Sequence, residues 1–485
     1  MSLASATPSP SASGARLTGD DTQHAIAWYH ALLSLRPRAG ITSIAVEAAR
    51  AGNVDDVVVR HATPPDDYLQ VKAAVAAAHP ATIAWLTAPT ARGGPSILQR
   101  FHQFFARASA AGESPHLQLI TNRSIDPADP ILTLRDRHDR VADRLRRAMT
   151  RRVVAARTAL GEHLAISDEE LCTFLDHLRL RTDASEATWT EAIRHISVAL
   201  GLDDSDPAVR MGVSEVREWV KTSRSEKTPG NIDAAVDRLG LRVAEPWETL
   251  VVQALDTEAD TQDATVLLDW VDRFLGDEAR TRRGLRNPGD WNTVLHDELV
   301  EAERALQTKR VLVRGQARLP VWFTVGTRLG RTRGYHVARM QNGEMWSTDR
   351  RPRALPELDA STLHEPVPGE PLALSVAVSA DPSADAAQHL AAHLPAAGHL
   401  RVALRTGIGS HALDGADHAW ATALALRDEV RRIAVQASPS VLHLFLATPA
   451  GLALLLGHVW DRVPDTQTYE DLAVNGYEPA FLIRN

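Results

Sequence analysis

Four residues near the N-terminus combine two carboxylates, an amide and a lysine in an order that suits phosphodiester hydrolysis: Glu47, Asp56, Gln70 and Lys72. Metal-assisted cleavage needs oxygen ligands for one or two Mg²⁺ (or Mn²⁺) ions, a water in line with the leaving group, and a cation that stabilises the extra charge. Gln70 and Lys72 can share a face because they stand two apart on one expected strand. Asp56 on the strand before it and Glu47 on an earlier strand would complete the metal ligands, since carboxylate and amide oxygens are hard ligands.

Lys72 stands out because this chain otherwise uses arginine as its cation. Of 53 basic residues only Lys72, Lys221, Lys227 and Lys309 are lysines. An ammonium is a compact charge with three donors, and it fits against a phosphate or a metal-bound water where a planar guanidinium is too large. The choice of lysine at this position therefore indicates phosphoryl chemistry.

Structural roles remain open for each of these residues taken singly. Asp55 and Asp56 could cap a turn, and Gln70 and Lys72 could form the solvated face of an edge strand. Asp55 could also replace Asp56 as the metal ligand. We favour Asp56, because Asp55 shares its side of the strand with apolar residues and that side is expected to face the core.

The order of the four residues resembles the PD-(D/E)XK restriction-endonuclease superfamily, in a variant with glutamine at the usual acidic position. The resemblance implies an α/β nuclease domain that cuts double-stranded DNA with a divalent metal. Gln70 departs from the superfamily pattern and should weaken metal binding, because an amide is a poorer ligand than a carboxylate. Gln23, on the first expected helix, lies where related domains often place a helical glutamine near the metal.

Length and composition favour several domains: 485 residues exceed what one hydrophobic core usually serves. We expect a disordered tail at 1–19, a nuclease domain at 20–230 (α/β core 20–130, helical extension 131–230), a helical linker at 231–307, and a second α/β domain at 308–485. The net charge of −8 does not by itself indicate nucleic-acid binding, so any basic surface must be local. The single cysteine, Cys172, excludes an internal disulfide and fits the cytoplasm.

Hydrophobic patterns give the expected elements. The front domain should contain a helix at 20–35 and strands at 41–46, 55–59, 67–71 and 116–121. In the second domain, strands at 310–314, 372–378, 400–404 and 442–447 alternate with helices at 416–434 and 452–460, which indicates a parallel sheet. The apolar stretch 441–460 contains prolines and glycines that favour a strand, a turn and a buried helix over a membrane span.

Nine arginines between residues 133 and 157 predict a local basic helix that could follow DNA phosphates without reading sequence. A solvated helix with internal ion pairs is the alternative, because Asp136 and Arg140, and Asp143 and Arg147, stand at i, i+4 spacing.

The C-terminal third carries a second resemblance. Its motifs are the run 319–326 (LPVWFTVG), Trp346-Ser347, and the order strand, Thr448-Pro449 turn, helix, Tyr469. They resemble the SAVED domain, the cyclic-oligonucleotide sensor of bacterial CBASS antiviral systems. The resemblance implies two fused CARF-like, Rossmann-type halves that bind a cyclic di- or trinucleotide between them.

Several residues are candidates for that ligand. Trp346 could stack on a base, Arg314 or Arg405 could hold phosphates, and the Thr448-Pro449 turn could present backbone amides at a helix N-terminus. Tyr469 is the remaining candidate. Tryptophans and threonines also serve as core and cap residues, and these alternatives stay open.

Together the resemblances imply a CBASS effector in which messenger binding drives self-association and non-specific DNA cleavage. Two alternatives remain: a sensor with a non-catalytic N-terminal scaffold, and a nuclease that acts alone or answers a CRISPR-linked cyclic oligoadenylate.

Overall fold

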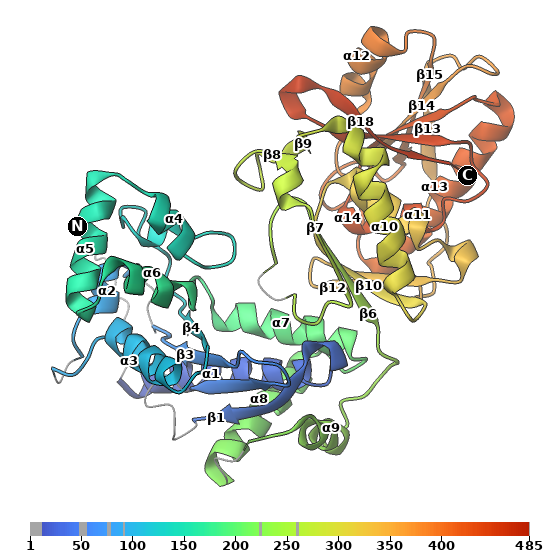
Figure 1. Ribbon diagram of the computed structural model, residues 1–485. Coiled ribbons are helices and arrows are strands. Elements are labelled where there is room, and N and C mark those ends of the chain that lie inside the picture. Colours follow the sequence, from blue (N-terminus) through green and yellow to red (C-terminus); the bar gives the residue numbers. More distant parts are fainter. Residues whose placement is uncertain are drawn as a thin grey trace, which may run out of the picture. The chain divides into compact units, whose positions relative to one another are not determined.

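A five-stranded sheet in the order β1-β2-β3-β4-β5 organises the first half of this computed structural model (Figure 1). Its strands are β1 (Ile41–Val46), β2 (Val57–His61), β3 (Asp67–Val71), β4 (His116–Ile120) and β5 (Leu178–Arg181). β1, β2 and β3 are antiparallel, whereas β3, β4 and β5 are parallel. The structure describes residues 12–47, 56–74, 79–90, 93–222, 226–258 and 261–484. Within them, the predicted hairpin and the predicted strands at 41–46 and 67–71 are confirmed.

Helices cover both faces of this sheet. α1 (Ala12–Leu33) contacts β1 to β3 and packs on α7 (Glu186–Ala199) and α8 (Asp206–Thr222). On the other face, α3 (Ile97–Ala110) buries aromatic residues against the sheet. The smaller helices are α2 (Ile83–Thr87), α4 (Ala142–Arg147), α5 (Arg151–Leu164), α6 (Asp168–Asp176) and α9 (Pro229–Arg238). α1 begins eight residues before the predicted start, so residues 12–19 are helical rather than part of a tail, and 1–11 lie outside the described residues.

Two sequence expectations about this unit are corrected. Val57, Val58 and Val59 are all 0% exposed, so both faces of β2 are buried and alternation cannot decide between Asp55 and Asp56. Asp55 itself lies outside the described residues. The arginine-rich segment 133–157 is not one helix: it contains a short 3-10 turn, the six-residue α4 and the start of α5.

The chain divides after Pro246, and the second unit begins at Trp247. Its two larger sheets are ordered β12-β11-β10-β6-β7 and β13-β15-β14-β16-β17-β18. The first uses β6 (Glu248–Gln253), β7 (Val266–Asp269), β10 (Arg310–Gln316), β11 (His336–Gln341) and β12 (Glu344–Ser347). The second uses β13 (Leu358–His364), β14 (Leu372–Ala377), β15 (Gly398–Leu404), β16 (Leu442–Ala447), β17 (Thr466–Asp471) and β18 (Tyr477–Ile483). The predicted parallel α/β organisation of this part is confirmed.

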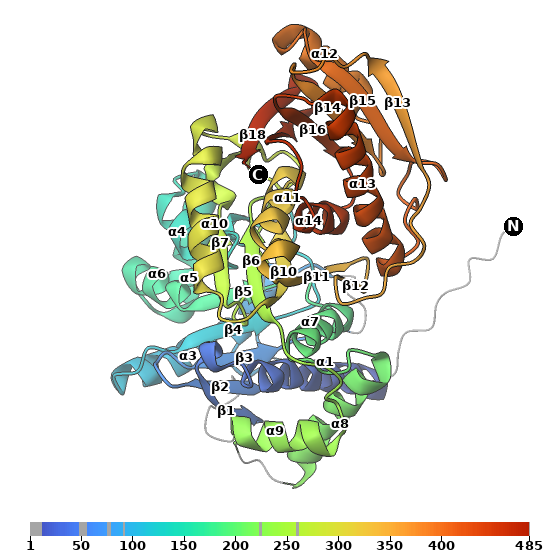
Figure 2. The ribbon, with the colours of Figure 1, turned by 90° about the vertical axis from the view of Figure 1, so that its right-hand side faces the viewer.

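Both sheets follow one plan. The second sheet has one additional edge strand, β13, which pairs with β15. When the other five strands of each sheet are numbered along the chain, they stand in the order 2-1-3-4-5, and the last two form an antiparallel hairpin. The helix after the third strand is α11 (Leu319–Arg328) in the first half and α14 (Ala450–His458) in the second. The other helices are α10 (Val294–Ala305), α12 (Ser383–His393) and α13 (Ala416–Ala437) (Figure 2). The unit is therefore a tandem of two related α/β halves.

Two glycines allow α11 and α14 to cross closely. A Cβ at Gly326 would overlap Leu454 O, and a Cβ at Gly457 would overlap Phe323 O. Each glycine thus faces the backbone carbonyl three residues before the other glycine. This reciprocal contact joins the two halves of the unit.

The helical linker predicted at 231–307 is wrong for its larger part. β6 and β7 lie in this range and, with β10, form consecutive parallel strands of one sheet. The small hairpin β8 (Phe274–Leu275) and β9 (Arg283–Leu285) also lies here. The segment from Trp247 onward is therefore part of the second α/β unit, and β5 likewise interrupts the predicted helical extension.

Candidate functional site

The front site lies where β2 begins and β3 ends. Asp56 immediately precedes β2, and its Oδ2 accepts hydrogen bonds from the Gln70 side-chain amide and from Val71 N (2.7 Å for Val71). Lys72 follows β3, and its backbone is held by Ile120 O and by the Thr121 hydroxyl, both at 2.8 Å. The structure therefore brings Asp56 and Gln70 into contact beside Lys72, as the spacing predicted.

Gln23 and Glu47 reach this site differently. The Gln23 side chain is buried and donates to Asp56 O at 3.2 Å, so the helical glutamine is indeed at the site. Glu47 N donates to the same carbonyl at 3.1 Å, but its side chain is exposed and its φ is 51°, in the left-handed region. The Glu47 backbone is thus adjacent to Asp56, while its carboxylate has no contact with the other three site residues in the described part of the chain.

Burial sets the electrostatics of the pair. Burial raises the pKa of Asp56, and the nearby Lys72 ammonium opposes this rise. Burial lowers the pKa of Lys72, while Asp56 opposes this fall and Arg100 of α3 adds to it. Each group is therefore the principal charge partner of the other, and a cation bound at Asp56 would favour its ionised form.

The donor set fits a Mg²⁺ ion that also uses substrate oxygens. Among the described residues, no group of three or more His, Cys, Asp or Glu side chains is placed to bind a metal together. Asp56 offers Oδ1, and Gln70, whose NH₂ donates to Asp56, keeps its carbonyl oxygen for a ligand. Mg²⁺ is commonly held by one or two carboxylates plus waters and substrate phosphates, so this sparse set matches the ion.

Most arginines of the 133–157 segment have structural partners. Arg135 pairs with Asp139 at 2.9 Å, Arg157 with Asp168 at 2.7 Å, and Arg146 with Asp176. The expected pair of Asp136 with Arg140 is instead a contact between the Asp136 carboxylate and Arg140 N. These contacts favour the ion-paired alternative over a free DNA-binding face for the residues concerned.

In the second unit, three of the predicted ligand residues are either buried or already paired with carboxylates. Arg314 is 7% exposed and pairs with Asp263 and Glu258, each at 3.1 Å. Trp346 is 4% exposed and its ring lies against Gly451 of α14, so neither indole face is open for stacking. Arg405 is exposed but pairs with Glu357.

The other predicted residues lie near the carboxyl ends of their strands. Thr448 is buried with a hydroxyl that has no hydrogen-bond partner in the described part of the chain, and Pro449 is the N-cap of α14. Tyr469 stacks on Phe445 (ring centroids 4.4 Å apart), and its hydroxyl contacts His443 Nδ1 at 2.7 Å. Burial raises the pKa of Tyr469 to about 12.

Sequence reasoning missed two cations at the carboxyl ends of the strands. Arg339 on β11 lies 4.0 Å from the Trp322 ring and donates to Gly315 O, but its Nε and Nη1 are buried and unpaired within the described ranges. Burial lowers its pKa to about 10. Arg318, at the start of α11, lies 3.3 Å from the buried Glu470 of β17 and so links the two halves. Nothing in their local sequence distinguishes these arginines from the many others.

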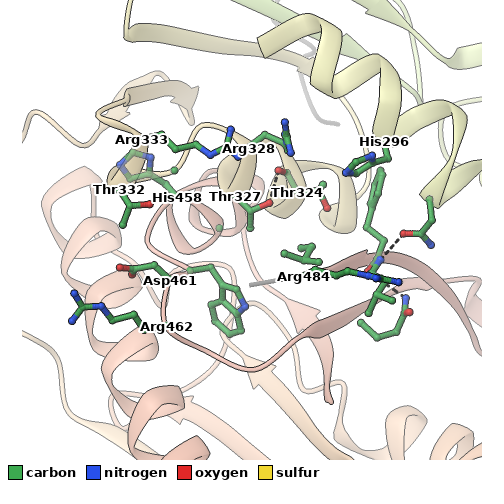
Figure 3. Close-up of a pocket in the computed structure, with 18 residues that line it drawn as sticks. His296, Thr324, Thr327, Arg328, Thr332, Arg333, His458, Asp461, Arg462 and Arg484 are labelled. Carbon is green, nitrogen blue, oxygen red and sulfur yellow. Dashed lines mark hydrogen bonds between the residues drawn. The ribbon is translucent and has the colours of Figure 1, made fainter. Parts of the chain in front are cut away.

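A cavity of about 820 Å³ lies at the opposite ends of α11 and α14 (Figure 3). Both halves of the unit line it, through the C-terminal parts of these helices, α10 and the end of β18. None of the six predicted ligand residues borders it.

Comparison with known proteins agrees with the second resemblance. Residues 295–483 match the family model of SAVED, the SMODS-associated and fused to various effectors sensor domain. The chain therefore carries a SAVED domain at its C-terminus, with the match beginning in α10. No curated protein matches the chain.

Solved structures give distant matches over the full length. An Acinetobacter baumannii Cap4 SAVED/CARF-domain containing receptor, solved with the cyclic trinucleotide 2'3'3'-cAAA, shares 15% identity at a TM-score of 0.44, covering 99% of this chain and 100% of that chain. A Moraxella osloensis Cap4 receptor shares 15% identity at a TM-score of 0.41, covering 96% and 99%. Among the described residues, no helix is both long and apolar enough to cross a membrane.

Proposed function

We propose that this protein is a cyclic-oligonucleotide-activated, metal-dependent endonuclease that cuts double-stranded DNA as a CBASS effector. The observation that carries the enzymatic part is that Asp56, Gln70 and Lys72 come together from the two strands of one hairpin, β2 and β3. The SAVED match at 295–483 supports the sensory part.

In the proposed reaction, Asp56 Oδ1 and the Gln70 carbonyl would hold Mg²⁺ together with oxygens of the substrate. When bound, the ion would supply Lewis acidity and make a bound water more acidic. Lys72 stabilises the negative charge that builds up on the phosphate as water forms a new P–O bond and the bond to the leaving oxygen breaks. Its backbone bonds to β4 fix the strand that presents it. Asp56 must be ionised to bind the metal, so activity should rise with pH through its raised pKa.

In the proposed sensor, the messenger binds beyond the carboxyl ends of the parallel strands, where open α/β sheets place their ligands. Arg339 can give two unpaired N–H donors to a phosphate, and Thr448 can add a hydroxyl at the start of α14. Because α11 and α14 cross tightly, a ligand that moves one half would also move the other. Self-association of the loaded protein would then bring nuclease units together.

One alternative has a specific observation in its favour. Asp56 is the single carboxylate in contact with Gln70 among the described residues, so the front unit could be a scaffold that no longer binds metal. Activity without any nucleotide would indicate a stand-alone nuclease, and a CRISPR-linked role would require a response to cyclic oligoadenylate.

The lysines of the chain provide a matched experiment. Lys72→Ala should reduce messenger-dependent DNA cleavage by on the order of 10² to 10³ in rate, since it removes a transition-state cation. Lys221→Ala is the control, because Lys221 is 67% exposed on α8 and pairs with Glu218. Both variants should bind the messenger as wild type does in calorimetry. Full activity of Lys72→Ala would refute the nuclease assignment. If Lys221→Ala also lost activity, the loss in Lys72→Ala could not be assigned to the nuclease site.

A further inference from the structure

The cavity at the C-terminal ends of α11 and α14 has the size of a small-molecule site. Its volume of about 820 Å³ lies within the range of roughly 300–1,000 Å³ that is usual for ligand pockets. It lies away from the proposed messenger residues, because it opens beside Gln467 at the start of β17 and Ile483 at the end of β18. The messenger residues stand at the other ends of the parallel strands.

The lining has an excess of positive charge. Arg328 and Arg333 share one carboxylate, that of Glu303, at 2.8 and 2.6 Å. Asp461, the acidic residue in the wall, is paired with Arg431 at 2.5 Å. Arg462 and Arg484 have no carboxylate partner in the described part of the chain. Two arginines share the single charge of Glu303, which leaves one positive charge in excess. Arg462 and Arg484 add one each, so the excess is three positive charges.

The positions of these arginines bear on the shape of the ligand. Figure 3 shows Arg462 and Arg484 at opposite ends of the cavity, with Arg328 and Arg333 along one wall. Arg328 can be explained as a cation that complements the C-terminal end of α11. That explanation does not extend to Arg462 or Arg484, because neither belongs to a helix. A ligand that satisfies both must carry negative groups at two separated points.

The wall between the charges is neutral and largely self-satisfied. Thr324 and Thr327 donate their hydroxyl protons to backbone carbonyls, each at 2.8 Å. His458 is buried, and its Nδ1 contacts Leu329 O at 2.6 Å, which assigns the proton to Nδ1. Nε2 is then the unprotonated nitrogen, and it can accept a hydrogen bond from a ligand N–H or O–H.

We propose that this cavity is a second anion site of the sensor unit, which binds a small ligand with two separated phosphate groups, such as a linear dinucleotide. The guanidinium groups of Arg462 and Arg484 hold the two phosphates, and the Arg328–Arg333 wall contacts the body of the ligand. This site goes beyond the proposed function and does not depend on it, because none of its residues belongs to the messenger or nuclease sites.

Calorimetric titration of the full-length protein with two probes tests the site: the linear dinucleotide pApA and inorganic pyrophosphate. Wild type should bind pApA. Arg462→Gln and Arg484→Gln should each weaken binding by about tenfold to a hundredfold, the usual cost of a charged hydrogen bond. Arg351→Gln is the matched control, since Arg351 is exposed, unpaired within the described ranges and outside the cavity. It should bind as wild type, and thermal melts should show all three variants folded.

Tighter binding of pApA than of pyrophosphate would support two separated phosphates rather than one compact anion. Arg339→Gln, which alters the proposed messenger site, should leave pApA binding unchanged. The proposal is overturned if wild type binds neither probe, if pyrophosphate binds as tightly as pApA, or if Arg351→Gln weakens binding as much as the two cavity variants. A wild-type protein that binds pApA but responds to no cyclic messenger would count against the proposed function alone.

Discussion

Glu470 offers a quantitative test of how the two sensor halves meet. Its side chain is 1% exposed at the end of β17, and its Oε1 has no hydrogen-bond partner in the described part of the chain, although Arg318 Nε lies 3.3 Å away. Burial raises the pKa of Glu470 from 4.5 to about 8, and Arg318 only partly opposes this rise. At neutral pH the folded protein therefore holds Glu470 largely as the neutral acid.

The sign of the effect follows from proton linkage. Because the folded state binds this proton more tightly than the unfolded state, the stabilisation is fully present below pH 4.5 and is lost as the pH rises through about 8. At about 1.4 kcal/mol per pKa unit, the whole change is roughly 5 kcal/mol, and the part between pH 6 and 9 is about 3 kcal/mol.

Glu470→Gln should remove this dependence, since an amide keeps the shape of the neutral acid and does not titrate. Urea unfolding of both proteins at pH 6 and pH 9 measures the difference, and the other titrating groups cancel in it. Wild type should lose about 3 kcal/mol more of its free energy of unfolding than Glu470→Gln over this interval. Equal losses in the two proteins would show that Glu470 is ionised when folded, and that the Arg318 contact is an ordinary ion pair.

Three further outcomes are expected. Trp346→Ala should lower the free energy of unfolding by about 3 to 5 kcal/mol and lower the melting temperature, because the Trp346 ring fills the space above Gly451. A variant that melts as wild type but binds the messenger more weakly would show instead that Trp346 stacks on a base. Gly457→Ala should destabilise the second unit, because its Cβ would overlap Phe323 O, whereas Gly289→Ala meets only an ordinary contact and should melt as wild type. Messenger binding should raise the sedimentation coefficient, and a monomer that cuts DNA at saturating messenger would contradict activation by assembly.

Local sequence patterns were sufficient for the elements that position the front site. The runs 41–46 and 67–71 are bounded by turn residues and rich in apolar side chains, and each forms a strand with the predicted bounds. The pairing of Asp56 with Gln70 followed from their order along a hairpin. The choice between Asp55 and Asp56 could not be predicted in this way. Helices cover both faces of the sheet, so both faces of β2 are buried and the alternation of apolar and polar residues does not identify the core side.

Long-range pairing explains what the sequence could not show. β6 lies in a segment with helical patterns on both sides, and its partner β10 begins more than 50 residues later. The burial of Trp346 depends on Gly451, more than 100 positions away. Likewise, the unpaired donors of Arg339 become visible only when β11 is placed beside β10 and α11. Tertiary neighbours decide these features, and no local window contains them.

Plasmid cleavage by the purified wild-type protein tests the central claim most directly. The protein is incubated with supercoiled plasmid and Mg²⁺, with and without each member of a panel of cyclic di- and trinucleotides. We expect degradation that requires both one messenger and the metal, and that EDTA abolishes. A protein that binds a messenger but leaves the plasmid intact with Mg²⁺ or Mn²⁺ would contradict the account and identify the front unit as a scaffold.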